Sequence, residues 1–132
     1  AGPMDKIASG GELARFLLAL KVVLSANEPP KTLIFDEVDS GVGGAVAAAV
    51  GARLARLGKK MQTLVITHSP QVASNGDHHL KIEKYQSGEQ MLSSTVGLSE
   101  DERLEEIARM LAGDEITEAA RSAAAQLLKG DR

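Results

Sequence analysis

The sequence predicts an α/β fold: a small, mostly parallel sheet flanked by helices, followed by a β-hairpin and two C-terminal helices. Two short apolar runs, residues 32–35 and 63–67, are typical of parallel strands buried on both faces. The alanine-rich stretch 45–57 between them ends at Gly58, as a crossover helix does. Only 2% of the residues are aromatic, so the core must be built from aliphatic side chains.

A helix is predicted at residues 10–25. Ser9 stands three residues before Glu12, the spacing of a capping box. Pro29 and Pro30 follow the helix, and proline cannot continue one. The apolar positions that recur at helical spacing are Leu13, Phe16, Leu17, Leu20 and Leu24.

The strand–helix–strand order places chemistry at one edge of the sheet. Parallel strands joined by a crossover have their carboxyl ends on the same edge, and ligands of open α/β sheets gather there. Asp36 and Glu37 follow the first run, and His68 follows the second. We expect these three side chains to share that edge.

The second half of the chain predicts a hairpin and two helices. Residues 79–96 form two extended runs around a Gly-Glu turn. Ser99 and Glu102 form a second capping box, and Gly113 ends the helix that follows. A last helix is expected at 114–129. The apolar positions of the two helices are Leu104, Ile107, Ala108 and Leu111, then Ile116, Ala120, Ala123 and Leu127.

Composition narrows the classes of function. A net charge of −3 gives no basic field, so direct DNA binding by this segment is not supported. The chain has no cysteine, which excludes disulfides and thiolate zinc sites and fits a reducing cytoplasmic setting. No apolar run approaches the roughly 20 residues of a membrane span. We interpret residues 1–5 as a cloning remnant or linker and 6–132 as one lobe.

Asp36 and Glu37 admit two interpretations. Adjacent carboxylates at the end of a buried strand resemble a Walker B motif, in which the first acid holds magnesium, commonly through water. Two solvated acids at a strand end are the simpler alternative. A lone histidine such as His68 is likewise more often a structural hydrogen-bonding residue than a catalytic one.

The two glycine-containing loops also admit more than one interpretation. Ser9, Gly10, Gly11 and Glu12 stand at a helix N-terminus, where free N–H groups attract phosphate. A plain helix cap is the commoner explanation of an isolated Ser-x-x-Glu, and a cap can also meet a ligand. Residues 39–44 are not a Walker A loop, because no Gly-Lys-Ser/Thr ends them, and they lack the third glycine of a dinucleotide-binding fingerprint. They predict a loop that enters the next helix.

The order of these segments resembles the C-terminal lobe of the RecN family of SMC-like, ABC-type ATPases. Residues 8–15 (Ala-Ser-Gly-Gly-Glu-Leu-Ala-Arg) are similar to its signature motif, and 35–42 (Phe-Asp-Glu-Val-Asp-Ser-Gly-Val) to its Walker B strand and D-loop. Residues 67–73 (Thr-His-Ser-Pro-Gln-Val-Ala) are similar to its switch-histidine loop. Residues 106–111 and 116–117 are similar to its C-terminal tail, so the resemblance runs from about Lys6 to Leu128.

The resemblance implies roles toward ATP and Mg²⁺. Asp36 would hold Mg²⁺, commonly through water, and Glu37 would be the general base toward the attacking water. His68 would sense the γ-phosphate, and Asp39, in the D-loop, would couple the two ATP sites of a head dimer.

The resemblance further implies a contact in trans. Ser9, Gly10 and Gly11, with Glu12 beside them, would contact the γ-phosphate of ATP held by a second head, so that ATP joins two heads and hydrolysis releases them. In the family this cycle acts in DNA double-strand-break repair and recombination. The implied partners are the N-terminal lobe of the same protein, a second RecN head and, through the full-length protein, DNA. The implied location is cytoplasmic and nucleoid-associated.

The chain departs from a complete head in what it lacks. It contains no Gly-x-x-x-x-Gly-Lys-Ser/Thr, no recognisable Q-loop and no long heptad stretch, so hydrolysis by this lobe alone should be negligible. Ser69 stands where leucine is common in the family. Two alternatives remain: a non-hydrolysing docking or regulatory lobe, and a head lobe of another SMC-like protein. Glu37 favours the ATPase, since a degenerate lobe would be free to lose its base.

Overall fold

A computed structural model describes residues 19, 32–113 and 115–130 of the chain. The chain divides after Asn75 into two compact units, which we describe separately. The helix predicted at 10–25 lies outside the described residues except for Ala19, which is helical. Among the described helices, none is both long and apolar enough to cross a membrane.

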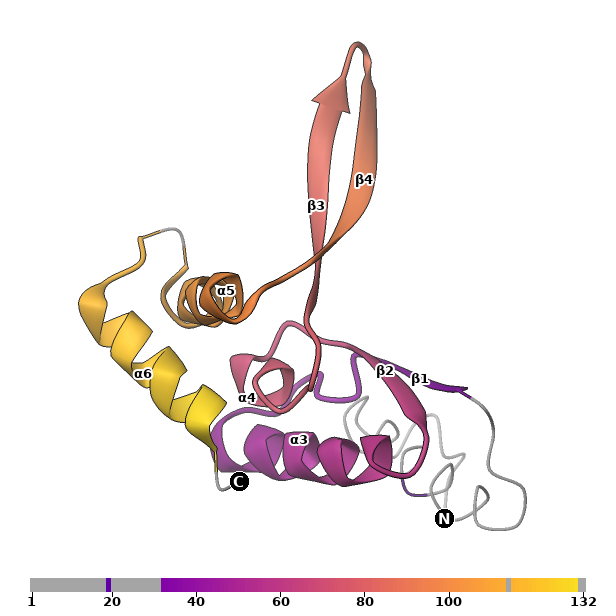
Figure 1. The fold of residues 1–132 in the computed structure, drawn as a ribbon, viewed down its shortest axis with the longest axis vertical. Coiled ribbons are helices and arrows are strands. Elements are labelled where there is room, and N and C mark those ends of the chain that lie inside the picture. Colours follow the sequence, from indigo (N-terminus) through magenta and orange to yellow (C-terminus); the bar gives the residue numbers. More distant parts are fainter. Residues whose placement is uncertain (1–18, 20–31, 114, 131–132) are drawn as a thin grey trace, which may run out of the picture. The chain divides into compact units, whose positions relative to one another are not determined.

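The first unit contains the predicted β-α-β arrangement (Figure 1). Strand β1 (Thr32–Asp36) leads into helix α3 (Gly44–Gly58), and strand β2 (Gln62–Ile66) follows. The two strands are parallel and in register from Thr32 opposite Gln62 to Asp36 opposite Ile66. The predicted strands, crossover helix and parallel pairing are therefore confirmed.

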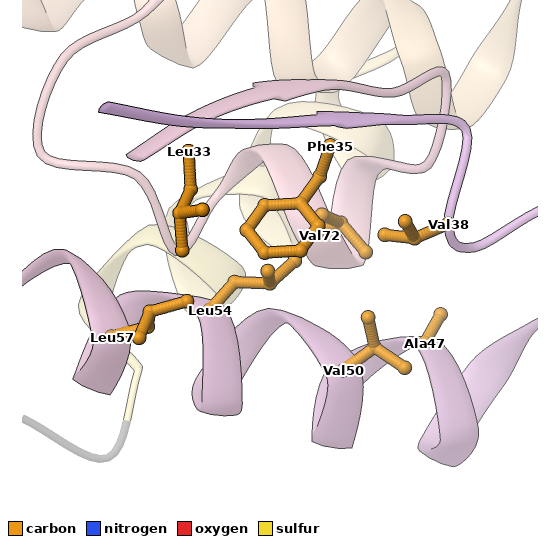
Figure 2. Close-up of a cluster of buried hydrophobic side chains, with 8 residues drawn as sticks. All are labelled: Leu33, Phe35, Val38, Ala47, Val50, Leu54, Leu57 and Val72. Atoms are coloured by element: carbon orange, nitrogen blue, oxygen red, sulfur yellow. The ribbon is translucent and has the colours of Figure 1, made fainter. Parts of the chain in front are cut away.

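One face of this sheet packs on α3. Figure 2 shows Leu33 and Phe35 of β1 pointing toward Leu54 of α3, with Phe35 only 1% exposed. The other members of this cluster are Val38, Ala47, Val50, Leu57 and Val72.

The opposite face of the sheet differs from the prediction. Exposure alternates along both strands, and Ile34 is 53% exposed. Leu64 and Ile66 are also exposed. Burial on both faces was therefore a wrong prediction for the described residues. The physical reason is that α3 comes from a single crossover and covers only one face.

A short helix that the sequence analysis did not predict completes the first unit. Helix α4 (Pro70–Ala73) has proline in its first turn and packs close to α3. The close approach depends on Gly51, since a Cβ atom there would lie 2.9 Å from the Gln71 carbonyl oxygen and 2.8 Å from Asn75 Nδ2. Four residues carry too little periodicity to be recognised in a sequence.

The second unit begins with the predicted hairpin. Strands β3 (Leu80–Ser87) and β4 (Gln90–Gly97) are antiparallel, and Gly88 begins the two-residue turn with φ of 62°. Figure 1 shows the pair as a long two-stranded ribbon. A positive φ is available to glycine without steric cost, which explains its place in a tight hairpin turn.

Two helices follow the hairpin. Helix α5 (Glu100–Ala112) starts with the predicted capping box: Glu102 N–H donates to Ser99 Oγ, and Ser99 N–H donates to the Glu102 carboxylate at 2.8 Å. Gly113 ends the helix, as predicted. Along α5, Ile107 and Ala108 are buried, whereas Leu111 is exposed.

Helix α6 (Glu118–Lys129) begins four residues later than predicted. The physical reason is Thr117, whose hydroxyl accepts a hydrogen bond from Ala120 N–H and so caps the helix. Ala120 and Ala124 face the interior, whereas Ala123, predicted to be apolar-facing, is exposed.

Candidate functional site

The carboxyl ends of β1 and β2 bring the predicted residues to one edge. Asp36, the last residue of β1, pairs with Ile66, the last residue of β2. Glu37 N–H then donates to the Ile66 carbonyl at 2.9 Å, which extends the ladder by one bond. His68 follows Ile66 by two residues, and the side chains of Asp36, Glu37 and His68 are all exposed. The edge thus presents two carboxylates and an imidazole to a ligand.

Glu37 has an unusual backbone conformation. Its φ is 48°, and no other non-glycine residue in the described ranges has a positive φ. The left-handed region crowds the Cβ atom of an L-residue and costs about 1–2 kcal/mol. The conformation turns the chain sharply after β1, and Ser40 N–H closes the turn on the Glu37 carbonyl at 2.9 Å. Backbone strain of this kind clusters at functional sites, so Glu37 remains a candidate site residue.

Asp39 lies inside the first unit, only 2% exposed. Its Oδ2 accepts a short hydrogen bond from the Thr67 hydroxyl. Its Oδ1 is buried and has no hydrogen-bond partner among the described residues. Sequence analysis identified Asp39 through its place in the D-loop but did not identify Thr67, since the two residues are 28 positions apart.

The loop that carries His68 is held on both sides of the imidazole. Before it, Thr67 is bonded to Asp39 and also accepts a hydrogen bond from Ser69 N–H at 2.9 Å. After it, Ser69 is buried, and its carbonyl accepts from Val72 N–H and Ala73 N–H in the first turn of α4. The backbone of His68 is therefore fixed between two bonded residues while its ring stays exposed.

The signature-like residues Ser9, Gly10, Gly11 and Glu12 lie outside the described residues. The structure therefore brings together one part of the predicted site, the acids and the histidine, and gives no account of the other part.

The remaining histidines belong to the second unit. His78 is exposed, and His79 is half-buried at the start of the second unit, where burial and the Arg103 guanidinium lower its pKa below the ordinary value of 6.5. Within the described ranges there is no group of three or more His, Asp or Glu side chains that could hold a metal ion by itself.

Three curated relatives resemble the chain along nearly its whole length, and all three are named DNA repair protein RecN. The chain is 48% identical over 132 residues to the protein of Streptomyces coelicolor, 50% over 125 residues to that of Rickettsia felis and 49% over 129 residues to that of Deinococcus radiodurans. These matches cover 100%, 95% and 98% of the chain but only 22–23% of each relative. No family model matches the chain.

Solved structures share the fold. A structure from work on ATP-driven dimerization and DNA-stimulated activation of SMC ATPases matches with a TM-score of 0.65 at 23% identity, over 83% of this chain and 66% of that chain. The Smc head domain of Pyrococcus yayanosii, with a coiled coil and joint, matches with a TM-score of 0.64 at 25% identity, over 76% of this chain and 19% of that chain. The predicted fold class, a lobe of an SMC-type head, is confirmed.

Proposed function

The chain is a C-terminal segment of the RecN family of DNA repair proteins, and we propose that it forms the C-terminal lobe of an ATPase head that works in double-strand-break repair and recombination. The proposal rests on the edge at the ends of β1 and β2, where Asp36, Glu37 and His68 are held by one parallel pair. Since the chain spans about a quarter of its relatives' length, activity belongs to a larger protein.

Asp36 and Glu37 have separate roles in this proposal. Asp36 is an exposed carboxylate fixed by the last pair of the ladder, and Mg²⁺ is typically held by one or two carboxylates, waters and substrate phosphates. The donor set therefore fits Mg²⁺, which when bound supplies positive charge against the phosphates of ATP. Glu37 would accept the proton of the attacking water, and its strained turn would hold the carboxylate in place.

His68 would contact the γ-phosphate from the neighbouring loop. An imidazole donates one hydrogen bond when neutral and two when protonated, so it can report whether the γ-phosphate is present. The fixed backbone on both sides of His68 supports this role, because a sensing side chain needs a rigid base.

The partners follow from what the chain lacks. It has no Walker A loop, so we propose that the N-terminal lobe of the same protein supplies the phosphate cradle and that this lobe alone is inactive. A second head would complete the site through Ser9, Gly10, Gly11 and Glu12 in trans. A matched SMC structure is described in terms of ATP-driven dimerization, which supports this arrangement. DNA would bind through the full-length, cytoplasmic, nucleoid-associated protein.

The test is Glu37→Gln in the intact head, which keeps the size of the side chain and removes the base. We expect turnover to fall by about 100-fold or more while ATP-dependent pairing of heads persists, because a general base contributes about 10²–10⁴-fold. The matched control is Glu89→Gln, an exposed carboxylate in the hairpin turn, which should leave turnover unchanged. Wild-type turnover in Glu37→Gln would show that Glu37 is not the general base. A wild-type head that binds partners but hydrolyses no ATP would favour a docking or regulatory lobe.

A further inference from the structure

We propose that Asp39 and Thr67 are positioning residues that clamp the acid turn after β1 to the histidine loop after β2, so that Glu37 and His68 move as one unit. The inference rests on the proposed ATPase function and adds to it a link within a single lobe. Neither Asp39 nor Thr67 touches a reacting atom in this account, and both act through their neighbours.

The clamp has two hydrogen bonds. The first joins backbones at the base of the loops, from Glu37 N–H to the Ile66 carbonyl at 2.9 Å. The second joins side chains further along both loops, from the Thr67 hydroxyl to Asp39 Oδ2. Glu37 donates the first bond, and it lies two residues before Asp39, which accepts the second. His68 lies one residue after Thr67. Each functional side chain is thus next to a bonded position of the clamp.

Thr67 is suited to the clamp because its hydroxyl has two tasks. It donates to Asp39 and accepts from Ser69 N–H, so a single oxygen joins the acid turn to the histidine loop and also braces that loop. A hydroxyl that is donor and acceptor at once is fixed in one rotamer. Valine has the same shape but can do neither task, whereas serine can do both.

Burial gives the clamp its strength. Asp39 is buried and its Oδ1 already has no hydrogen-bond partner among the described residues. Removing the Thr67 hydroxyl would take a donor from a carboxylate that water does not reach. A buried polar group left without a partner is costly, so the acid turn should shift to recover one. A shift of the acid turn displaces Glu37 relative to His68.

The first experiment compares two variants of Thr67 in the intact head. We expect Thr67→Val to lower kcat for ATP hydrolysis by about 10- to 100-fold with KM changed less than about twofold, the magnitude of a lost hydrogen bond to a charged group. Thr67→Ser should stay within about threefold of wild type. The matched control is Thr63→Val, since Thr63 lies on β2 and its hydroxyl donates to the Met61 carbonyl of its own strand start rather than to the acid turn.

A double-mutant cycle tests whether Asp39 and Thr67 act together. Asp39→Ala should lower kcat by no more than Thr67→Val, which also removes the acceptor of Ser69 N–H. The double variant should cost no more than Thr67→Val alone, because the bond that Asp39→Ala removes is then already lost. Asp39→Asn keeps an acceptor oxygen, so it should lose less than Asp39→Ala and remains informative if Asp39→Ala fails to fold. Additive losses in the double variant would overturn the clamp.

A readout independent of turnover separates the clamp from the proposed function. Amide hydrogen exchange in the peptides that cover 37–42 and 67–73 should become about 10-fold faster in Thr67→Val and not in Thr67→Ser, because the acid turn and the histidine loop lose the side-chain bond that joins them. Unchanged exchange overturns the clamp whether or not the head hydrolyses ATP. If Thr67→Val has wild-type kcat while Glu37→Gln is inactive, the positioning role of Thr67 is overturned. The ATPase assignment then still stands, because it depends on Glu37.

Discussion

Both sheets in the described part of the chain have two strands, yet they are built in opposite ways. The β1–β2 pair is parallel and buries one face on α3, with Phe35 in the centre of the cluster in Figure 2. The β3–β4 pair is antiparallel and exposed on both faces: Ile82 and Met91 project from one, Tyr85 and Leu92 from the other. The candidate site lies at the edge of the β1–β2 pair, whereas the described β3–β4 pair carries no candidate site.

The difference teaches what a site requires from its scaffold. The backbone that carries the two carboxylates at the end of β1 is held by the ladder and by the packed face of the sheet. A two-stranded hairpin in water is marginally stable without a packed face. Its apolar residues therefore contribute little to folding by themselves, and it would hold a catalytic group loosely.

The largest difference in stability between the two sheets is expected when one core side chain is removed. We expect Phe35→Ala to lower the free energy of unfolding by about 3–5 kcal/mol, since a buried aromatic is lost and a cavity is left. Tyr85→Ala, on the exposed hairpin, should cost less than about 1 kcal/mol. Urea unfolding of both variants measures the contrast. Equal losses would mean that the hairpin is as well packed as the β1–β2 sheet.

The contact between α3 and α4 predicts a smaller effect. Gly51→Ala gains helix propensity of about 1 kcal/mol, but the added methyl group meets the Gln71 carbonyl oxygen, and overpacking costs about 1–3 kcal/mol. We expect a net loss of about 1–2 kcal/mol in urea unfolding. Gly58→Ala is the matched control, because nothing lies within 4 Å of a Cβ there, and it should be neutral or slightly stabilising. A larger loss of stability in Gly58→Ala than in Gly51→Ala would contradict the close packing of α4 on α3.

Charged side chains join the base of the hairpin to helix α5. Glu106 of α5 is buried and pairs with Arg109 at 2.5 Å and with Lys81 of β3 at 3.3 Å. Hydrogen bonds from Arg109, and then from Lys81, hold the pKa of Glu106 below its ordinary value of 4.5. A lowered carboxyl pKa stabilises the folded state above pH 4.5, and that contribution is lost as the pH falls through the folded pKa.

Glu106→Gln should therefore cost about 1 kcal/mol at neutral pH and flatten the acid limb of a plot of stability against pH. Glu105→Gln is the matched control, because Glu105 is an exposed carboxylate bonded to Arg121, and it should have a smaller effect. An unchanged acid limb in Glu106→Gln would show that other carboxyl groups cause the acid dependence.

The smallest stability change is expected at the site itself. Glu37→Gly relieves the left-handed φ of 48° but adds backbone freedom to the unfolded chain, so we expect a stabilisation of about 0.5–1 kcal/mol. Turnover in the intact head should be lost. Thermal unfolding and ATPase assays together check the prediction. Destabilisation would contradict the strain at Glu37.

The sequence predicted those parts of the fold that local patterns specify. The β-α-β order, the hairpin turn at Gly88 and the capping box at Ser99 each depend on residues close together in the chain. The start of α6 was missed because the cap at Thr117 competed with a longer apolar pattern. The exposure of one sheet face was missed because apolar strand runs do not reveal how many helices cover the sheet.

The same distinction applies to the site. Asp36, Glu37 and His68 could be assigned to one edge, because parallel topology brings strand ends together. The bond between Asp39 and Thr67 could not be predicted, since it joins residues 28 positions apart through side chains. The left-handed turn at Glu37 carries no sequence signal either, because a glycine would be expected at such a φ.

ATP hydrolysis by this lobe, alone and mixed with a separately produced N-terminal lobe, tests the central claim most directly. We predict no turnover by the lobe alone, turnover in the mixture, and loss of that turnover when this lobe carries Glu37→Gln. An inactive mixture in which the two lobes are shown to associate would contradict the ATPase assignment and favour a docking lobe.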